Sequence, residues 1–223
     1  MFKFLGSCYD VSVIIPAFNE VKTISCVVRR CLRYASEVIV VDDGSWDGTA
    51  EAAEKTGAKV IRHGENRGIN EALKTGFREA RGDIIVRVDG DGQHDPSYIP
   101  LLAGLVASGE ADLVVGRRSS IPPAELLISA LVWPLVRVHD AGSGFIAIRK
   151  KLAQRLTLES RSTCGTLLLE AATMGARIRE VPIPVHPRLD GKRRLKINYL
   201  KHFLVLLKYI KTSLLQKLRQ LNI

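Results

Sequence analysis

The stretch DIIVRVDGDGQHDP, residues 83–96, joins an apolar run to a dense group of polar and acidic side chains. Asp89, Asp91 and Asp95 lie within this short segment, together with Gln93 and His94. Because neighbouring carboxylates repel one another, their crowding indicates that a charged ligand binds here.

The apolar-then-polar pattern recurs along the chain and predicts the fold class. Runs rich in Val and Ile, typical of buried strands, occupy residues 11–16, 37–43, 59–63, 83–89 and 111–116. Helical patterns occupy residues 20–34, 47–56, 69–80 and 96–107. Residues 143–150 and 176–185 add two further strand patterns, with a helical pattern at 164–175 between them. The alternation predicts an α/β fold with a mostly parallel central sheet flanked by helices.

Polar clusters follow three of these strands. They read PAFNE (16–20), DDGSWDGT (42–49) and DGDGQHD (89–95). Asp47, Asn66 and Asp95 precede helical patterns and are expected to cap them, with Pro96 at a first helical position. Ligands of open α/β sheets bind at the carboxyl ends of the strands, so the three clusters are predicted to form one site.

Three kinds of site could account for the acidic cluster. A calcium-binding EF-hand loop is excluded, because His94 stands where that loop needs Gly and Pro100 stands at its closing acidic position. Helix capping accounts for Asp95 but leaves Asp89 and Asp91 unexplained. The favoured interpretation is a Mg²⁺ or Mn²⁺ site, in which the two aspartates supply a few oxygens and substrate phosphates supply others.

Phosphate binding by a glycine-rich loop is not available to this chain. It contains no G-x-x-x-x-G-K-[ST] motif, and no G-x-G-x-x-G follows the first strand. Phosphates must then be held by metal and by arginines. The candidates are Arg67, Arg117, Arg118, Arg188 and Arg194.

Composition limits the remaining possibilities. A chain of 223 residues, 46% hydrophobic, can bury one substantial core, and its formal charge of +10 predicts attraction to polyanions. The four cysteines include no C-x-x-C pair, which predicts a reduced cytoplasmic protein without a zinc framework. No run approaches the roughly 20 apolar residues that a spanning helix needs, and the N-terminus does not resemble a signal peptide.

An ordered set of motifs carries a family resemblance. VIIPAFNE (13–20), VVDDGSWDGT (40–49), NRGI (66–69), DGDGQHDP (89–96) and SGF (143–145) together resemble the family 2 glycosyltransferases of GT-A fold. Among these, the polyprenyl-phosphate (dolichol-phosphate) mannosyltransferases are the most similar branch, over about residues 11–195. The resemblance implies an inverting, metal-dependent transfer of a hexose, mannose from GDP-mannose, to a polyprenyl or dolichyl phosphate.

The resemblance also implies roles for individual residues. Nucleotide binding falls to Pro16, Ala17, Phe18, Glu20, Asp42, Asp43 and Asp89; metal binding to Asp89, Asp91 and Gln93; catalysis to Asp91 and Arg117; and acceptor phosphate binding to Arg117, Ser143 and Arg188. Of the other candidate arginines, Arg67 is expected to bind the nucleotide and Arg194 the acceptor phosphate, and Asp140 is expected to act in catalysis by orienting the acceptor. Three positions depart from the family pattern. Phe18 replaces a Tyr, His139 replaces an Arg, and Arg193 and Arg194 stand where Ser and Lys are usual.

A lipid acceptor would require contact with a membrane. Residues 196–223 form a basic amphipathic segment after a catalytic domain at residues 1–195, and its pattern fits either an interfacial helix on anionic lipid or a helix packed on the sheet or on a second subunit. We expect a peripheral protein at the cytoplasmic membrane face; whether a membrane-spanning partner subunit delivers the acceptor stays open. The alternatives are a UDP-glucose-dependent glucosyltransferase and a non-catalytic binder of nucleotide sugars or nucleic acid. No nucleic-acid recognition motif supports the latter.

Overall fold

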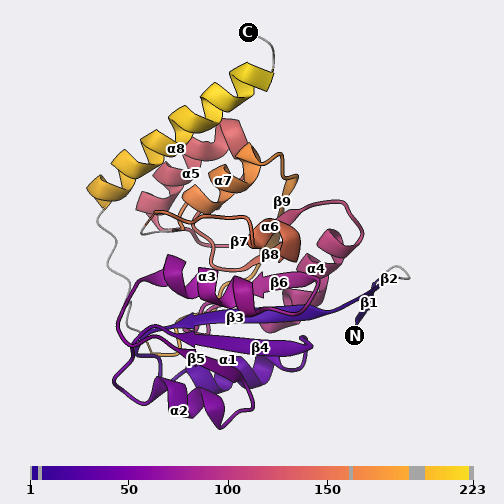
Figure 1. Ribbon diagram of the computed structural model, residues 1–223, viewed down its shortest axis with the longest axis vertical. Coiled ribbons are helices and arrows are strands. Elements are labelled where there is room, and N and C mark those ends of the chain that lie inside the picture. The colour runs from indigo at the N-terminus through magenta and orange to yellow at the C-terminus, as the bar shows by residue number, and fades with distance from the viewer. Residues whose placement is uncertain (1, 5–6, 161–162, 191–198, 221–223) are drawn as a thin grey trace.

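A seven-stranded sheet forms the centre of the molecule in a computed structural model that describes residues 2–4, 7–160, 163–190 and 199–220 (Figure 1). In the order in which they lie side by side, its strands are β5 (Lys59–Arg62), β4 (Glu37–Asp42), β3 (Val11–Ala17), β6 (Ile84–Arg87), β8 (Ile146–Arg149), β7 (Leu113–Arg118) and β9 (Ile178–Ile183). A separate hairpin is formed by β1 (Phe2–Phe4) and β2 (Ser7–Tyr9).

The sheet is mostly parallel, as the sequence predicts. Strands β5, β4, β3 and β6 pair in parallel, and so do β7 and β9, whereas β8 runs antiparallel to both of its neighbours. The chain crosses from β3 to β4 on one side and later to β6 on the other. Such a reversal of strand order opens a crevice at the carboxyl ends, where open α/β sheets bind ligands.

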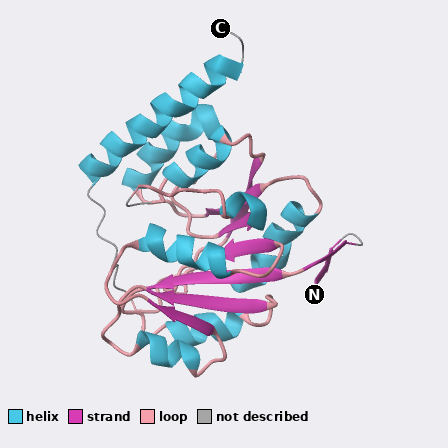
Figure 2. Ribbon diagram, in the orientation of Figure 1, coloured by secondary structure: helices cyan, strands magenta, loops and turns pink. Residues whose placement is uncertain are grey.

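Helices cover both faces of the sheet (Figure 2). One face packs against α1 (Ile24–Cys31), α2 (Thr49–Glu54) and α4 (Ile99–Ala107); the other packs against α3 (Ile69–Glu79), α5 (Pro123–Val136), α6 (Lys150–Ala153) and α7 (Thr166–Thr173). A short 3₁₀ helix, η1 (Pro96–Tyr98), precedes α4. Both faces are therefore dry: in β3, Ile14 belongs to one apolar core and Ile15 to the other, and neither is exposed. Burial on both faces explains the nearly continuous apolar run of this strand.

The C-terminal helix α8 (Tyr199–Gln220) lies outside these layers. Figure 1 shows it lying across α5 and α7, on the side of those helices away from the sheet. Leu206 is fully buried in this contact, whereas Phe203, Leu204 and Leu207 are exposed. One face of the amphipathic segment thus packs on the protein and another faces outward. Among the described residues, no helix combines the length and the apolar character needed to cross a bilayer.

The helix caps predicted from the sequence were confirmed only in part. Asp95 caps η1, because its Oδ1 accepts a hydrogen bond from Ser97 N over 3.1 Å. Asp47 is not the N-cap of α2, which is Gly48, but from one residue earlier its Oδ1 accepts a hydrogen bond from Thr49 N over 3.0 Å. The expected cap at Asn66 is wrong, because α3 begins only at Ile69, after Gly68, whose φ of 94° favours glycine.

Candidate functional site

A cavity of about 870 Å³ opens at the carboxyl ends of β3, β4 and β6, where the polar clusters were predicted to meet. Its walls carry the acidic residues Glu20, Asp43, Asp89, Asp91 and Glu125 and the arginines Arg87, Arg118 and Arg188. Burial lowers the pKa of the wall residue His94, so its ring adds little positive charge at neutral pH. The acidic residues outnumber the arginines, which favours binding of a further cation.

Asp89 is held from behind by a buried arginine. Arg87 Nη2 donates to Asp89 Oδ1 over 2.9 Å, and Arg87 Nη1 donates to Thr163 Oγ1 over 2.8 Å. The Arg87 side chain is 5% exposed, whereas 32% of Asp89 remains exposed. Burial by itself would raise the pKa of Asp89, but positive charge nearby, above all that of Arg87, holds the pKa below its usual value. Asp89 is therefore ionised at neutral pH.

Asp91 has a different environment in the same cavity. Its Oδ1 accepts a hydrogen bond from Gln93 N over 3.0 Å, and its Oδ2 lies 2.6 Å from Arg188 Nη1. Burial, and then the charge of Asp89, raise the pKa of Asp91. A positive ion placed between the two carboxylates would remove this mutual repulsion.

The residues present fit a hard divalent ion that the substrate helps to hold. No group of three or more His, Cys, Asp and Glu side chains suited to a metal occurs within the described part of the chain. Asp89 and Asp91 offer carboxylate oxygens, and Gln93 lines the same wall. Mg²⁺ usually binds through one or two carboxylates plus substrate phosphates and water, so a two-carboxylate site suits it.

The predicted nucleotide residues separate into two groups. Pro16, Ala17, Phe18, Glu20 and Asp43 line the cavity with Asp89, as the resemblance implies. Asp42 and Arg67 are not among its lining residues: Asp42 Oδ1 accepts from Ser45 N over 3.1 Å, and Arg67 contributes its backbone N–H to Asp43 Oδ1 over 3.1 Å.

The arginine that enters the cavity from β7 is Arg118. Its Nε donates to Asp140 Oδ2 over 2.8 Å and its Nη2 donates to Glu125 Oε2 over 2.6 Å. Burial opposes its charge, but the hydrogen bonds to Asp140 and Glu125 raise the pKa of Arg118 overall. Asp140 is fully buried and does not line the cavity, so it acts on the site through Arg118.

Of the expected acceptor residues that the structure describes, only one lines the cavity. Arg188 is in its wall. Arg117 lines an adjoining hollow of about 630 Å³, which shares Arg118 and Ile121 with the cavity. Ser143 Oγ donates to Gly116 O over 2.7 Å and lies outside both. Arg194 lies outside the described residues.

The carboxylate of Glu180 contacts both Arg117 and His139, the residue that replaces the Arg of the family pattern. Glu180 Oε2 lies 2.9 Å from His139 Nδ1 and 3.8 Å from Arg117 Nη1. His139 is 61% exposed and is not among the residues that line the hollow.

The wall residues to which the sequence analysis assigned no role include Arg87, His94, Glu125 and Gly142. Arg87 stands inside an apolar strand, and Glu125 stands in an apolar helix at the only charged position of α5. Burying a charge inside an apolar run costs free energy unless the charge is paired. A lone charged residue in such a run is therefore the sequence signal that could have identified Arg87 and Glu125.

The sheet topology and the acidic cavity together define the GT-A class of fold. The family described as "Glycosyl transferase family 2" matches residues 12–166, which is more than half of the chain. The chain therefore belongs to glycosyl transferase family 2.

Named relatives share this family. The chain is 31% identical to a dolichol-phosphate mannosyltransferase of Pyrococcus furiosus, over 89% of this chain and 64% of that protein. It is also 31% identical to an undecaprenyl-phosphate mannosyltransferase of Micrococcus luteus, over 83% of this chain and 87% of that protein. The chain thus spans a little under two thirds of the Pyrococcus protein.

A solved structure also resembles the structure of this chain. Glucosyl-3-phosphoglycerate synthase from Mycobacterium tuberculosis, crystallised with Mn²⁺, UDP and phosphoglyceric acid, matches with a TM-score of 0.73 and 25% identity, over 93% of this chain and 78% of that chain.

Proposed function

We propose that this protein transfers a hexose from a nucleoside diphosphate sugar to a polyprenyl or dolichyl phosphate, with inversion at the anomeric carbon. The observation that carries the proposal is the placement of Asp89 and Asp91 in one cavity with Arg87, Arg118 and Arg188. Relatives that act on dolichol phosphate and undecaprenyl phosphate support the choice of acceptor.

The cavity residues divide the work of holding the donor. Asp89 and Asp91, with Gln93, would hold Mg²⁺ or Mn²⁺, which supplies charge stabilisation for the departing diphosphate. Arg188, 2.6 Å from Asp91, lies beside the place where these phosphates would bind. Guanidinium groups bind phosphate oxygens in bidentate fashion, so Arg188 is suited to neutralise part of their charge.

The acceptor needs little help from a base. A phosphomonoester has its second pKa near 6, so at neutral pH it is already largely a dianionic nucleophile. Asp140 is engaged with Arg118, and its role is to fix that guanidinium at the border between the cavity and the hollow. Arg117 and Arg118 both line the hollow, and their charges would reduce the repulsion between an incoming phosphate there and the donor.

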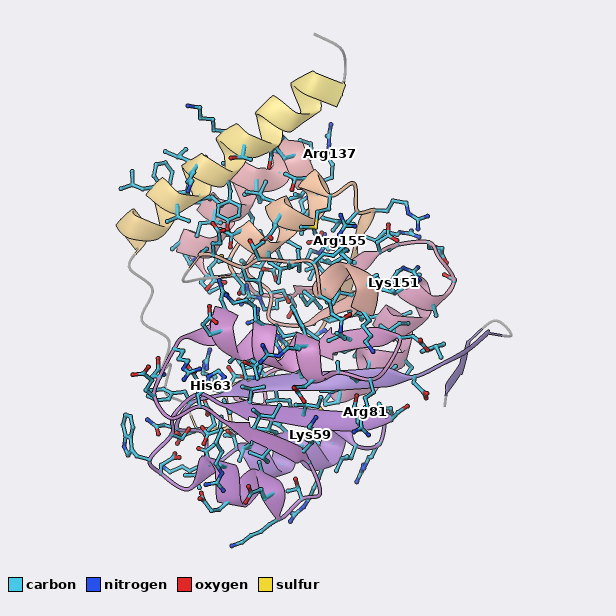
Figure 3. All side chains as sticks on the ribbon, viewed as in Figure 1. Lys59, His63, Arg81, Arg137, Lys151 and Arg155 are labelled. Atoms are coloured by element: carbon cyan, nitrogen blue, oxygen red, sulfur yellow. The ribbon has the colours of Figure 1, made fainter. Side chains whose placement is uncertain are left out.

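An apolar face next to the hollow would contact the membrane. Leu126 lines the hollow and is exposed, as are Leu127 and Trp133 on α5 and Phe203, Leu204 and Leu207 on α8. Lys208 and Lys211 on α8 are exposed beside them. Arg137, labelled at the end of α5 in Figure 3, stacks on Trp133 at 4.5 Å from the ring centroid. Apolar side chains flanked by cations are typical of surfaces that bind anionic bilayers.

Vesicle flotation tests this membrane face. Leu127→Glu and Leu204→Glu should reduce binding to vesicles that contain anionic lipid. Leu101→Glu is a matched control, because Leu101 is also an exposed leucine but belongs to α4, which packs on the opposite face of the sheet. Equal losses for all three variants would contradict the proposed orientation.

Two donors have specific support. The mannosyltransferase relatives favour GDP-mannose, and the solved structure with UDP favours a UDP-sugar such as UDP-glucose. Radiolabelled forms of both should be incubated with undecaprenyl phosphate, with 3-phosphoglycerate or with no acceptor, in the presence of Mn²⁺ or EDTA. We expect label in the lipid phosphate, only when Mn²⁺ is present. Label in phosphoglycerate alone would overturn the lipid acceptor.

A further inference from the structure

We propose that Glu180 is a positioning residue for the transfer reaction: its carboxylate fixes the bend at residues 139–140, and Asp140 in that bend fixes Arg118. This role rests on the proposed function, because Arg118 then meets the acceptor phosphate. Glu180 itself lies on β9 and is not among the residues that line the cavity or the hollow.

Glu180 accepts hydrogen bonds from two consecutive backbone N–H groups of the bend. Its Oε1 accepts from His139 N over 2.9 Å and from Asp140 N over 2.8 Å, and its Oε2 lies 2.9 Å from His139 Nδ1. The Glu180 side chain is 11% exposed, and Asp140 is fully buried. Because a buried N–H without a partner is unfavourable, the bend would have to move if Oε1 were withdrawn.

Asp140 transmits the position of the bend to Arg118. Its Oδ2 accepts from Arg118 N over 3.0 Å and from Arg118 Nε over 2.8 Å, and its Oδ1 accepts from Arg118 Nη2 over 2.7 Å. A carboxylate that pairs with two nitrogens of a guanidinium fixes the plane of that group. Nη1 of Arg118 bonds none of the residues that the structure describes, so it is the nitrogen left for a phosphate oxygen. The direction in which it points therefore depends on Glu180.

The charge of Glu180 has less effect than its hydrogen bonds. Its Oε2 lies 3.8 Å from Arg117 Nη1, beyond hydrogen-bond distance, and the Arg117 side chain is 41% exposed. Ion pairs that are this long and this exposed contribute little. The contacts thus favour a role through the backbone of residues 139–140 rather than through attraction to Arg117.

Two conservative variants separate the hydrogen bonds from the charge. Glu180→Asp keeps the charge, but its carboxylate ends about one C–C bond, roughly 1.5 Å, short of the two N–H groups. We expect its KM for undecaprenyl phosphate to rise about 10- to 100-fold, because a misdirected Arg118 loses a charged hydrogen bond to the phosphate. Glu180→Gln loses the charge but keeps an oxygen at the Oε1 position. It should raise this KM less than about threefold.

Asp112→Ala is the matched control. Asp112 also accepts a hydrogen bond from a backbone N–H across the β7–β9 pair, from Arg177 N over 3.0 Å, but at the opposite end, where both strands begin. Asp112→Ala should lower the unfolding temperature and leave the KM for undecaprenyl phosphate unchanged. In the Glu180 variants, the KM for the nucleotide sugar should also stay unchanged, and circular dichroism shows whether each variant folds.

Three results would overturn the inference. One is a normal KM for undecaprenyl phosphate in Glu180→Asp. Another is a rise of about tenfold or more in Glu180→Gln, because the charge would then matter more than the hydrogen bonds. The third is a rise in Asp112→Ala as large as that in Glu180→Asp, because loss of any carboxylate between these strands would then have the same effect.

Crystal structures of the wild-type protein and of Glu180→Asp separate this outcome from that of the proposed function. A displaced Arg118 guanidinium in Glu180→Asp would support the positioning role even if the wild-type protein transfers no sugar to lipid phosphate, a result that would refute the acceptor alone. An Arg118 guanidinium that stays in place would refute the positioning role even if transfer to lipid phosphate is observed.

Discussion

Gly144 stands where any side chain would collide with a proposed metal ligand, so Gly144→Ala tests the site without removing a functional group. A Cβ built on Gly144 lies 1.9 Å from Asp89 Oδ2 and 2.3 Å from Asp89 Cγ. Ordinary van der Waals contact begins at 3.4 Å, so the carboxylate must shift by about 1.5 Å (3.4 minus 1.9). Asp89 is 32% exposed and can move into the cavity, at the cost of its bond to Arg87.

The expected result is loss of activity with retention of the fold. Misplacing a reacting or positioning group by about 1 Å can cost about 100-fold in rate, so we expect transfer by Gly144→Ala to fall about 100-fold and Mn²⁺ affinity to fall with it. Steady-state transfer assays and titration with Mn²⁺ measure the two effects. Gly64→Ala is the matched control, because a Cβ there meets nothing within 4 Å. Gly144→Ala with normal Mn²⁺ affinity and normal rate would refute the assignment of Asp89.

Three further predictions follow from the contacts described. Asp91→Ala, or chelation of the wild-type protein with EDTA, should abolish transfer while circular dichroism stays unchanged; activity that survives chelation would contradict the metal role. Arg118→Met should cost about 3–5 kcal/mol of stability in urea unfolding, because it leaves Asp140 buried without its partner, whereas Arg117→Met, at a position 41% exposed, should cost less than about 1 kcal/mol. Hydrogen bonds from Arg177 lower the pKa of Asp112 to about 2, below its ordinary value, so this pair stabilises the fold above about pH 4 and the contribution disappears as pH falls toward 2. Because Arg177 is 59% exposed, screening limits that contribution to about 1 kcal/mol; Asp112→Asn should lose it at pH 7 but not at pH 2, and an equal loss at both pH values would refute the pairing.

Much of the fold could be predicted from the sequence because both faces of the sheet are buried under helices. Strands such as β3 and β4 then appear as continuous apolar runs, and the polar clusters mark where they end. The direction of β8 could not be predicted in the same way. Its run IAIR fits a parallel or an antiparallel strand equally, and its antiparallel pairing with β6 and β7 is evident only in the folded chain.

The sequence predicted the site residues whose chemistry and position at a strand end both indicate a ligand. It did not predict the residues whose role depends on the direction in which the side chain points. Asp89 and Asp91 follow a strand, so their place at the sheet edge is fixed by the fold. Arg117 and Arg118 are adjacent on β7, and adjacent strand residues point to opposite faces, yet the sequence does not show which one faces the cavity. The carboxylates that hold Arg118, on α5 and before β8, come together only in the folded chain.

The most direct test of the account is the position of manganese in a crystal of this protein soaked with Mn²⁺ and a nucleoside diphosphate, located by its anomalous scattering. We predict one Mn²⁺ bound to carboxylate oxygens of Asp89 or Asp91 and to phosphate oxygens of the nucleotide. A nucleotide bound in the cavity with no manganese at these aspartates, or manganese bound at a different site, would contradict the account.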